Sequence, residues 1–281
     1  MDIPRMLAIS PPIPIDHQVA LKTWRAYRIA NGYSADVRLL TEPTGNAKLN
    51  KSGRLDYGLS LAPARTSGYN ACPWSTPICR AGCVAFAGRG TGPAGRSGHT
   101  ITEARILKTR FLVEERDAFC TLVRDELANI VKRQRSIARK KHKKFRAVAC
   151  RLNVFSDIPW EKVAPWMLIP EVKFYDYSKG WHRVTPANYH LCYSASENTS
   201  DADVVAKCAT GATVAVVFNA RYRPNETTHG ALPVTFQGIQ VVDGDKMDTR
   251  YDDVPGQVIG LRAKGSMRAS GGGMVRDAAT Q

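Results

Sequence analysis

The sequence predicts an α/β protein whose core is a mostly parallel sheet or a partial (β/α) barrel. Two observations predict this fold class. Short apolar runs recur along the chain and each ends in polar residues, which is typical of buried strands. Segments with helical character separate these runs, and strands that alternate with helices favour a parallel sheet. The expected strands span residues 56–64, 145–155, 172–177, 189–194, 213–218, 238–242 and 257–263.

The longest expected helix begins at a cap on Thr100 or Thr102 and runs toward residue 141. Apolar residues recur in it at helical spacing, and charged residues occupy the opposite face. We expect a kink or break near Asp117. Shorter helices are expected at residues 17–29, 159–168 and 201–210, with another from Pro186 onward. The sequence thus divides into an N-terminal extension (1–40), a single α/β domain (41–265) with a cysteine loop after its first strand, and a flexible tail (266–281).

Composition indicates an intracellular protein with an anionic partner. The chain has 281 residues, with 40 Lys and Arg against 25 Asp and Glu, so its formal net charge is +15. Such an excess favours polyanions, and nucleic acid is the default polyanion inside a cell. No apolar run approaches the roughly 20 residues that cross a bilayer, and the first residues do not resemble a secretion signal. The odd count of 7 cysteines indicates a reducing compartment. We expect no membrane partner and leave the oligomeric state open.

Positive charge is concentrated between residues 132 and 146, in the run KRQRSIARKKHKKFR. One interpretation is a solvated helix end and loop that serves solubility. The other is contact with the phosphate backbone of DNA or RNA, which depends on salt and carries little sequence preference. The residues expected to bind nucleic acid are Arg139, Lys140, Lys141, Lys143 and Lys144.

Three cysteines lie close together in the segment NACPWSTPICRAGC, directly after the first expected strand. Prolines and glycines favour a compact loop here, so the thiols of Cys72, Cys79 and Cys83 are expected to converge. Gathered thiolates suit an iron–sulfur cluster or zinc, and three ligands leave one coordination position open. Buried apolar thiols are the main alternative, and a disulfide is the other.

Polar side chains follow several expected strands, at the ends where parallel α/β folds bind their ligands. After the second strand come Asn153, Asp157 and Glu161, which are the catalytic candidates. The candidates for binding a cofactor are Ser194, Ser196, Glu197, Asp243 and Asp245. Asp248 extends the last pair into a possible magnesium site of a nuclease, a third and weaker hypothesis. Ordinary solvated loops are the alternative for each residue taken singly.

Several longer motifs together resemble a bacteriophage family known as the gene-product-88-like domain. They are TGNAKL at 44–49, SLAPARTSGYNACPW with CRAGC, ARILKTRFL, RLNVFSDIPWE, FYDYSK, VVDGDKMDTRYDD and GLRAKG, and they cover roughly residues 41–265. The resemblance implies a phage origin and a protein in the cytoplasm of the infected bacterial host. It implies no particular activity, so whether the protein is an enzyme stays open.

The arrangement is also similar to radical S-adenosylmethionine enzymes, in which three cysteines after the first barrel strand hold an iron–sulfur cluster. The spacing here is C-x6-C-x3-C, which departs from the C-x3-C-x2-C of those enzymes. The resemblance implies S-adenosylmethionine as a candidate cofactor. We expect a metal- or iron–sulfur-containing protein that acts on nucleic acid or a nucleotide. The alternative is a non-enzymatic nucleic-acid-binding protein of phage replication or host takeover, with a structural metal site.

Overall fold

The computed structural model describes residues 1–35, 38–43, 55–86, 100–142, 145–221, 229–270 and 273–279. Its helices are α1 (Ile3–Ile9), α2 (His17–Ala30), α4 (Pro77–Ala81), α5 (Ile101–Glu114), α6 (Arg116–Lys140), α7 (Trp160–Val163), α8 (Asp201–Ala209) and α9 (Met267–Ser270), with short 3-10 turns η2 (Val84–Phe86) and η5 (Pro165–Met167). Its strands are β1 (Leu55–Gly58), β2 (Val148–Arg151), β3 (Val172–Ser178), β4 (Tyr189–Ser194), β5 (Thr213–Phe218), β6 (Thr235–Phe236), β7 (Ile239–Asp243), β8 (Val258–Arg262) and β9 (Val275–Arg276).

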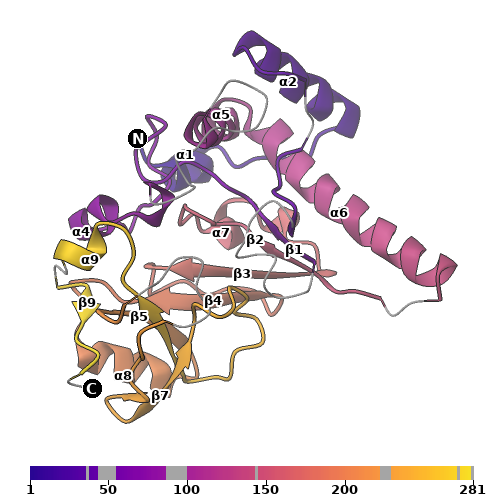
Figure 1. Cartoon of the computed structure of the whole chain (residues 1–281). Helices are drawn as coiled ribbons and strands as arrows, with labels where there is room; N and C mark the ends of the chain where they lie inside the picture. The colour runs from indigo at the N-terminus through magenta and orange to yellow at the C-terminus, as the bar shows by residue number, and fades with distance from the viewer. Residues whose placement is uncertain are drawn as a thin grey trace.

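The strands form one sheet in the order β1-β2-β3-β4-β5-β8-β7-β6, and β9 also pairs with β5 (Figure 1). The pairings are parallel except between β6 and β7, which are antiparallel. The predicted α/β class and mostly parallel sheet are therefore confirmed. The sheet is open and does not close into a barrel.

The strand order explains why one face of the sheet carries most of the helices. From β1 to β5 the strands lie side by side in chain order. Because parallel crossovers are right-handed, connections that always advance in one direction leave the sheet on the same face. Leu191 and Tyr193 of β4 identify this face. Leu191 belongs to the hydrophobic cluster that contains residues of α5, α6 and α7, and Tyr193 packs against that cluster. Tyr193 also packs against the second cluster, which contains residues of α8. We call this the helix face.

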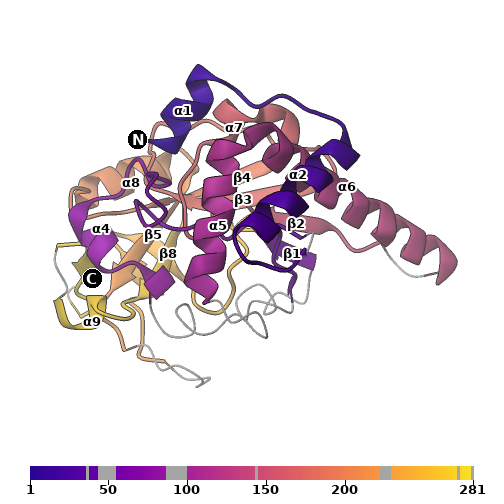
Figure 2. The ribbon, with the colours of Figure 1, turned by 90° about the horizontal axis from the view of Figure 1, so that it is seen from above.

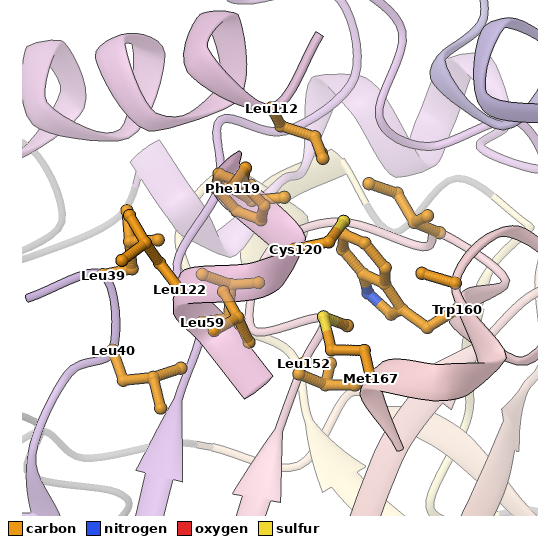
Figure 3. Packing of buried hydrophobic residues seen from close by; sticks show 14 of the residues in the cluster. Leu39, Leu40, Leu59, Leu112, Phe119, Cys120, Leu122, Leu152, Trp160 and Met167 are labelled. Carbon is orange, nitrogen blue, oxygen red and sulfur yellow. The ribbon is translucent and has the colours of Figure 1, made fainter. Parts of the chain in front are cut away.

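The main hydrophobic core fills the helix face (Figure 3). Phe119 of α6 stacks on Trp160 of α7 with ring centroids 6.4 Å apart. Trp24 of α2 contacts Phe111 of α5 at 4.5 Å, so the N-terminal segment packs into the same core. Figure 2 shows α1, α2, α5 and α6 gathered over β1 to β4.

The opposite face, which we call the pocket face, has a smaller cluster. It consists of Cys192, Ala215 and Ile259, with Tyr177, Val242 and Leu261 packed against them. Strand alternation places these residues on the other side from the helix-packed ones. Loops rather than long helices cover this face. The candidate site lies there.

Several local predictions differ from the structure. The long helix is broken at Glu115 into α5 and α6, close to the expected break, and Thr100 caps α5 with a capping box to Glu103. No helix follows Pro186, whose carbonyl accepts a hydrogen bond from Tyr189 N–H in the turn before β4. Helices α1 and α4 were not expected. The tail expected to be flexible contributes α9 and β9, and β9 pairs with β5. No described helix has the length and apolar character to span a membrane.

Candidate ligand-binding pocket and cysteine loop

A pocket of about 320 Å³ lies on the pocket face at the carboxyl ends of the strands. This volume is at the lower end of the range for small-molecule sites. Its polar lining combines thiols, cations and carboxylates from β2, β3, β4 and β8 and from the segments that follow β1, β3, β7 and β8. These residues are Cys79, Cys83, Arg151, Tyr177, Lys179, Ser194, Asp245, Asp248, Arg262 and Lys264. The apolar lining includes Val217, Leu261 and Met267.

β4 and β5 separate next to the pocket. Their pairing ends at Ser194 and Ala215, and farther along β5 the same edge pairs with β9 at Val217 and Phe218. Beyond Ser194 the chain turns away toward α8, which leaves space above the strand ends.

One side of this space is closed by the segment between β7 and β8, residues 244–257, which we call the strap. Tyr251 of the strap donates a hydrogen bond to Asp56 of β1 over 3.1 Å, and its ring contacts that of Tyr175 in β3. Asp248 forms an ion pair of 2.8 Å with Arg151 of β2. The strap therefore crosses the pocket face as far as the β1 edge. Two of its buried polar atoms, Thr249 Oγ1 and Arg250 Nε, have no hydrogen-bond partner among the described residues.

The two predicted aspartates at the end of β7 lie in an ion-pair cluster. Arg262 contacts Asp243 at 2.8 Å and Asp245 at 3.2 Å, and Lys264 also pairs with Asp245. Burial raises the pKa of Asp243, but hydrogen bonds from Arg262 and from the Asp245 N–H outweigh it and hold that pKa below its usual value. Asp245 lines the pocket, whereas Asp243 does not. A magnesium ion at this position would have to compete with two cations already in place.

The cysteine loop forms part of the pocket rim. Thr76 caps α4, Pro77 begins it, and Cys79 lies within it. Cys79 and Cys83 line the pocket, whereas Cys72 lies deeper: its sulfur accepts a hydrogen bond from Ala64 N–H at 3.2 Å and its thiol donates to Phe155 O at 3.5 Å.

Burial makes two of these thiols hard to ionise. It raises the pKa of Cys72 to about 12, and the neighbouring Cys79 and Cys83 contribute to the increase. Burial also raises the pKa of Cys83, although Arg105 and Lys179 act in the opposite direction. All seven cysteines are free thiols. Within the ranges that the structure describes, no three His, Cys, Asp or Glu side chains are grouped as metal ligands.

The catalytic candidates Asn153, Asp157 and Glu161 do not line the pocket but belong to a buried polar network behind it. Asn153 donates from its backbone N–H and its side-chain amide to the Asp176 carboxylate, at 2.7 and 2.9 Å. Tyr189 also donates to this carboxylate, at 2.5 Å. Burial raises the pKa of Asp176 to about 7.

Arg183 forms ion pairs with the other two catalytic candidates, Asp157 and Glu161. Its guanidinium contacts Asp157 at 3.1 Å and both carboxylate oxygens of Glu161 at 3.0 and 2.7 Å. Asp157 in turn accepts hydrogen bonds from Ser178 Oγ at 2.7 Å and Lys179 N–H at 2.8 Å. The network thus fixes the turn that carries Lys179 into the pocket. The catalytic role of the three candidates stays a prediction.

The sequence places Asp176 and Lys179 among the polar residues at the end of the third strand but indicates no role for either, and it does not single out Arg183. Asp176 carried a usable signal, since it is the one carboxylate inside the apolar run VKFYDY. Arg183 follows a turn and has no local pattern that would predict its complete burial.

Two of the other predicted cofactor residues line a second, more open pocket of about 640 Å³ beside the first, and Glu197 does not line either pocket. Ser194 lines both pockets, and Ser196 lines the second. Glu197 accepts hydrogen bonds from Thr76 Oγ1 at 2.7 Å and from Ile78 N–H at 3.4 Å. Its role in this geometry is to hold the start of α4, and with it the cysteine loop.

The first part of the basic run, residues 132–140, forms the last turns of α6, which project beyond the sheet in both ribbon views (Figures 1 and 2). From residue 132 to residue 142 no side chain is buried. Arg139, Lys140 and Lys141 are exposed there, while Lys143 and Lys144 lie outside the described residues. Cations at a helix C-terminus also interact favourably with the helix dipole, so charge here has a structural benefit too.

Comparison with known proteins decides the family. The family model described as Gene product 88 matches residues 38–278. The chain belongs to the Gene product 88 family. The match covers the expected domain and most of the tail, and it supports the phage origin implied by the sequence motifs. No curated protein and no solved structure matches the chain. Nothing found supports the likeness to radical S-adenosylmethionine enzymes.

Proposed function

We propose that this Gene product 88 family member acts on a nucleotide or on nucleic acid in the pocket at the strand ends, in the cytoplasm of the infected host. Cys72, Cys79 and Cys83 hold an iron–sulfur cluster, or alternatively zinc, at the pocket rim. One observation carries the proposal: Cys79 and Cys83 line the same pocket as Lys179, at the edge of the sheet where parallel folds bind ligands.

Three cysteines in one loop offer the ligand type that a soft metal prefers. Metal binding removes the thiol protons, so it opposes the effect of burial that keeps Cys72 and Cys83 protonated in the free chain. Lys179 and Arg105 favour a thiolate at Cys83. Cys72 would have to give up its hydrogen bonds to Ala64 and Phe155 to turn toward the other two sulfurs. Three thiolates would hold the cluster and would leave one coordination position for another ligand.

Lys179 is the group best placed to bind an anionic substrate. It lines the pocket, and Asp157 and Ser178 fix its backbone. S-adenosylmethionine is one cofactor that the proposal admits, with Ser194, Ser196 and Asp245 as its candidate contacts.

A second candidate function is a non-enzymatic nucleic-acid-binding protein with purely structural cysteines. The hydrogen bonds that satisfy the Cys72 thiol in the free chain favour it. In that case α6 carries the function, and changes to the cysteines leave nucleic-acid binding intact.

Metal analysis of protein purified without oxygen tests the main proposal. Iron with sulfide, or zinc, is expected in a fixed ratio to protein. Cys72→Ala, Cys79→Ala and Cys83→Ala should each lose the metal. The matched control is Cys120→Ala, because Cys120 is fully buried in the helix-face core and should change stability but not metal content. Fresh protein that contains neither iron nor zinc would show that the cysteines are not metal ligands.

Binding of duplex DNA at several salt concentrations tests the nucleic-acid part. If about five side chains reach phosphates, a fourfold rise in salt should weaken binding roughly 10²–10³-fold. Changing Arg139, Lys140, Lys141, Lys143 and Lys144 together to Gln should flatten that dependence. The control changes five exposed cations that are not part of α6: Arg5, Lys22, Arg25, Arg65 and Lys246. Equal effects of the two variants would assign the basic run to solubility.

A further inference from the structure

One ammonium group, that of Lys179, lines both pockets. Lys179 and Ser194 line both of them. Lys179 follows β3 and its side chain is half-buried between the cysteine loop and the loop after β4. No ion pair is recorded for its ammonium within the described part of the chain. An anion bound at Lys179 would therefore be accessible from either pocket.

The second pocket has aromatic walls that are held in place. Trp74 lies against the backbone of Gly180 so closely that a Cβ there would be 2.8 Å from the ring. The edge of His182 packs on the same indole at 5.3 Å. Trp181 donates its indole N–H to Ser194 O at 3.1 Å. Both Trp rings line the pocket and are partly exposed, which is the property that lets a flat base stack on a protein.

Two ammonium groups, those of Lys179 and Lys207, line this pocket beside one carboxylate, that of Asp203. Lys207 lies 3.8 Å above the Tyr193 ring and donates to Trp181 O at 2.8 Å. The Asp203 carboxylate already accepts hydrogen bonds from Ser200, as part of the α8 cap. The Glu197 carboxylate is bound to the start of α4 and lies near enough to Lys179 for the ammonium to act on its pKa.

We infer that the second pocket binds a nucleoside monophosphate, with its base against Trp74 and Trp181 and its phosphate at Lys179, next to the first pocket. The exposed Asn198 amide lines the same pocket and offers a donor and an acceptor for a base edge. The inference rests on the proposed function and names its substrate class.

Calorimetric titration of the full chain, purified without oxygen, tests the inference. The probes are deoxyadenosine 5′-monophosphate, deoxyadenosine and inorganic phosphate. The nucleotide should bind more tightly than either of its halves. Lys179→Gln should weaken the nucleotide without affecting deoxyadenosine. Gly180→Ala should displace Trp74 and weaken both, by roughly 5- to 150-fold if one stacking contact is lost. Lys22→Gln, an exposed cation on α2, is the matched control and should bind normally.

Three results would overturn the inference: no nucleotide binding, inorganic phosphate binding as tightly as the nucleotide, or equal effects of Lys179→Gln and Lys22→Gln. Trp74→Leu replaces Gly180→Ala if that variant does not fold. Metal content is measured on the same samples. Metal without nucleotide binding refutes only this inference, whereas nucleotide binding without metal refutes the proposed cluster and leaves the subsite intact.

Discussion

Replacing Arg183 by Met removes the cation that neutralises two buried carboxylates. The Arg183 side chain is 0% exposed, and those of Glu161 and Asp157 are 5% and 11% exposed. A carboxylate left at this depth without its partner is poorly solvated, and breaking a buried pair from one side typically costs about 3–5 kcal/mol. For a chain of 281 residues that loss corresponds to a decrease in Tm of about 5–9 °C.

Urea unfolding followed by circular dichroism measures this loss. The triple variant Arg183→Met, Asp157→Asn, Glu161→Gln removes the charges together and should recover at least half of the lost free energy of unfolding. Arg139→Met, on the exposed end of α6, should change stability little. A loss below about 1 kcal/mol for Arg183→Met, or a triple variant no more stable than the single one, would refute the reasoning.

Two further predictions concern the buried polar groups near the strand ends. Burial raises the pKa of Asp176 to about 7, whereas the unfolded carboxyl ionises near 4, so the folded state retains the proton longer. The protonated Asp176 carboxyl therefore contributes fully to stability below about pH 4, and this contribution should be lost as pH rises toward 7. Asp176→Asn should flatten the pH dependence of the free energy of unfolding measured in urea. An unchanged pH dependence would contradict the prediction. Thr109 Oγ1 accepts a hydrogen bond from Ala62 N–H at 2.8 Å inside the core. Thr109→Val should lower the free energy of unfolding by about 1–3 kcal/mol, because it leaves the Ala62 N–H unpaired. The control Thr23→Val, on α2, should lower it less. Equal losses in the two variants would show that the hydrogen bond from Ala62 contributes nothing.

Local sequence patterns predicted the sheet well because its strands are buried and continuous. The apolar runs at β4 and β5 match the predicted bounds, and the helix break falls at Glu115, close to the expected Asp117. The two-residue strands β6 and β9 are too short to show any period, and they depend on partners elsewhere in the chain. Likewise α1 and α4 are helices of a single turn or two, whose formation depends on packing and capping rather than on their own propensity.

The candidate site could be predicted only in part. The polar residues that follow consecutive parallel strands lie at the edge of the sheet where the pockets are, and Ser194 and Asp245 line the first pocket, while their binding role stays a prediction. The sequence did not predict which way each side chain points. Asp157 is turned toward Arg183, a residue 26 positions later, and this long-range pairing leaves no trace in the local sequence.

The strap has a consequence for how the pocket exchanges its contents. Thr249 Oγ1 and Arg250 Nε are buried without hydrogen-bond partners among the described residues, and a buried group that no water reaches either costs about 1–3 kcal/mol. When the strap detaches, water solvates these atoms, so part of the free energy needed to break its contacts with β1 and β2 is recovered. Because the main core lies on the helix face, the strap can detach while that core stays intact. Its amides should then exchange with deuterium through local opening, far faster than those of β4 and β5, and ligand entry would follow the rate of that opening rather than the rate of global unfolding.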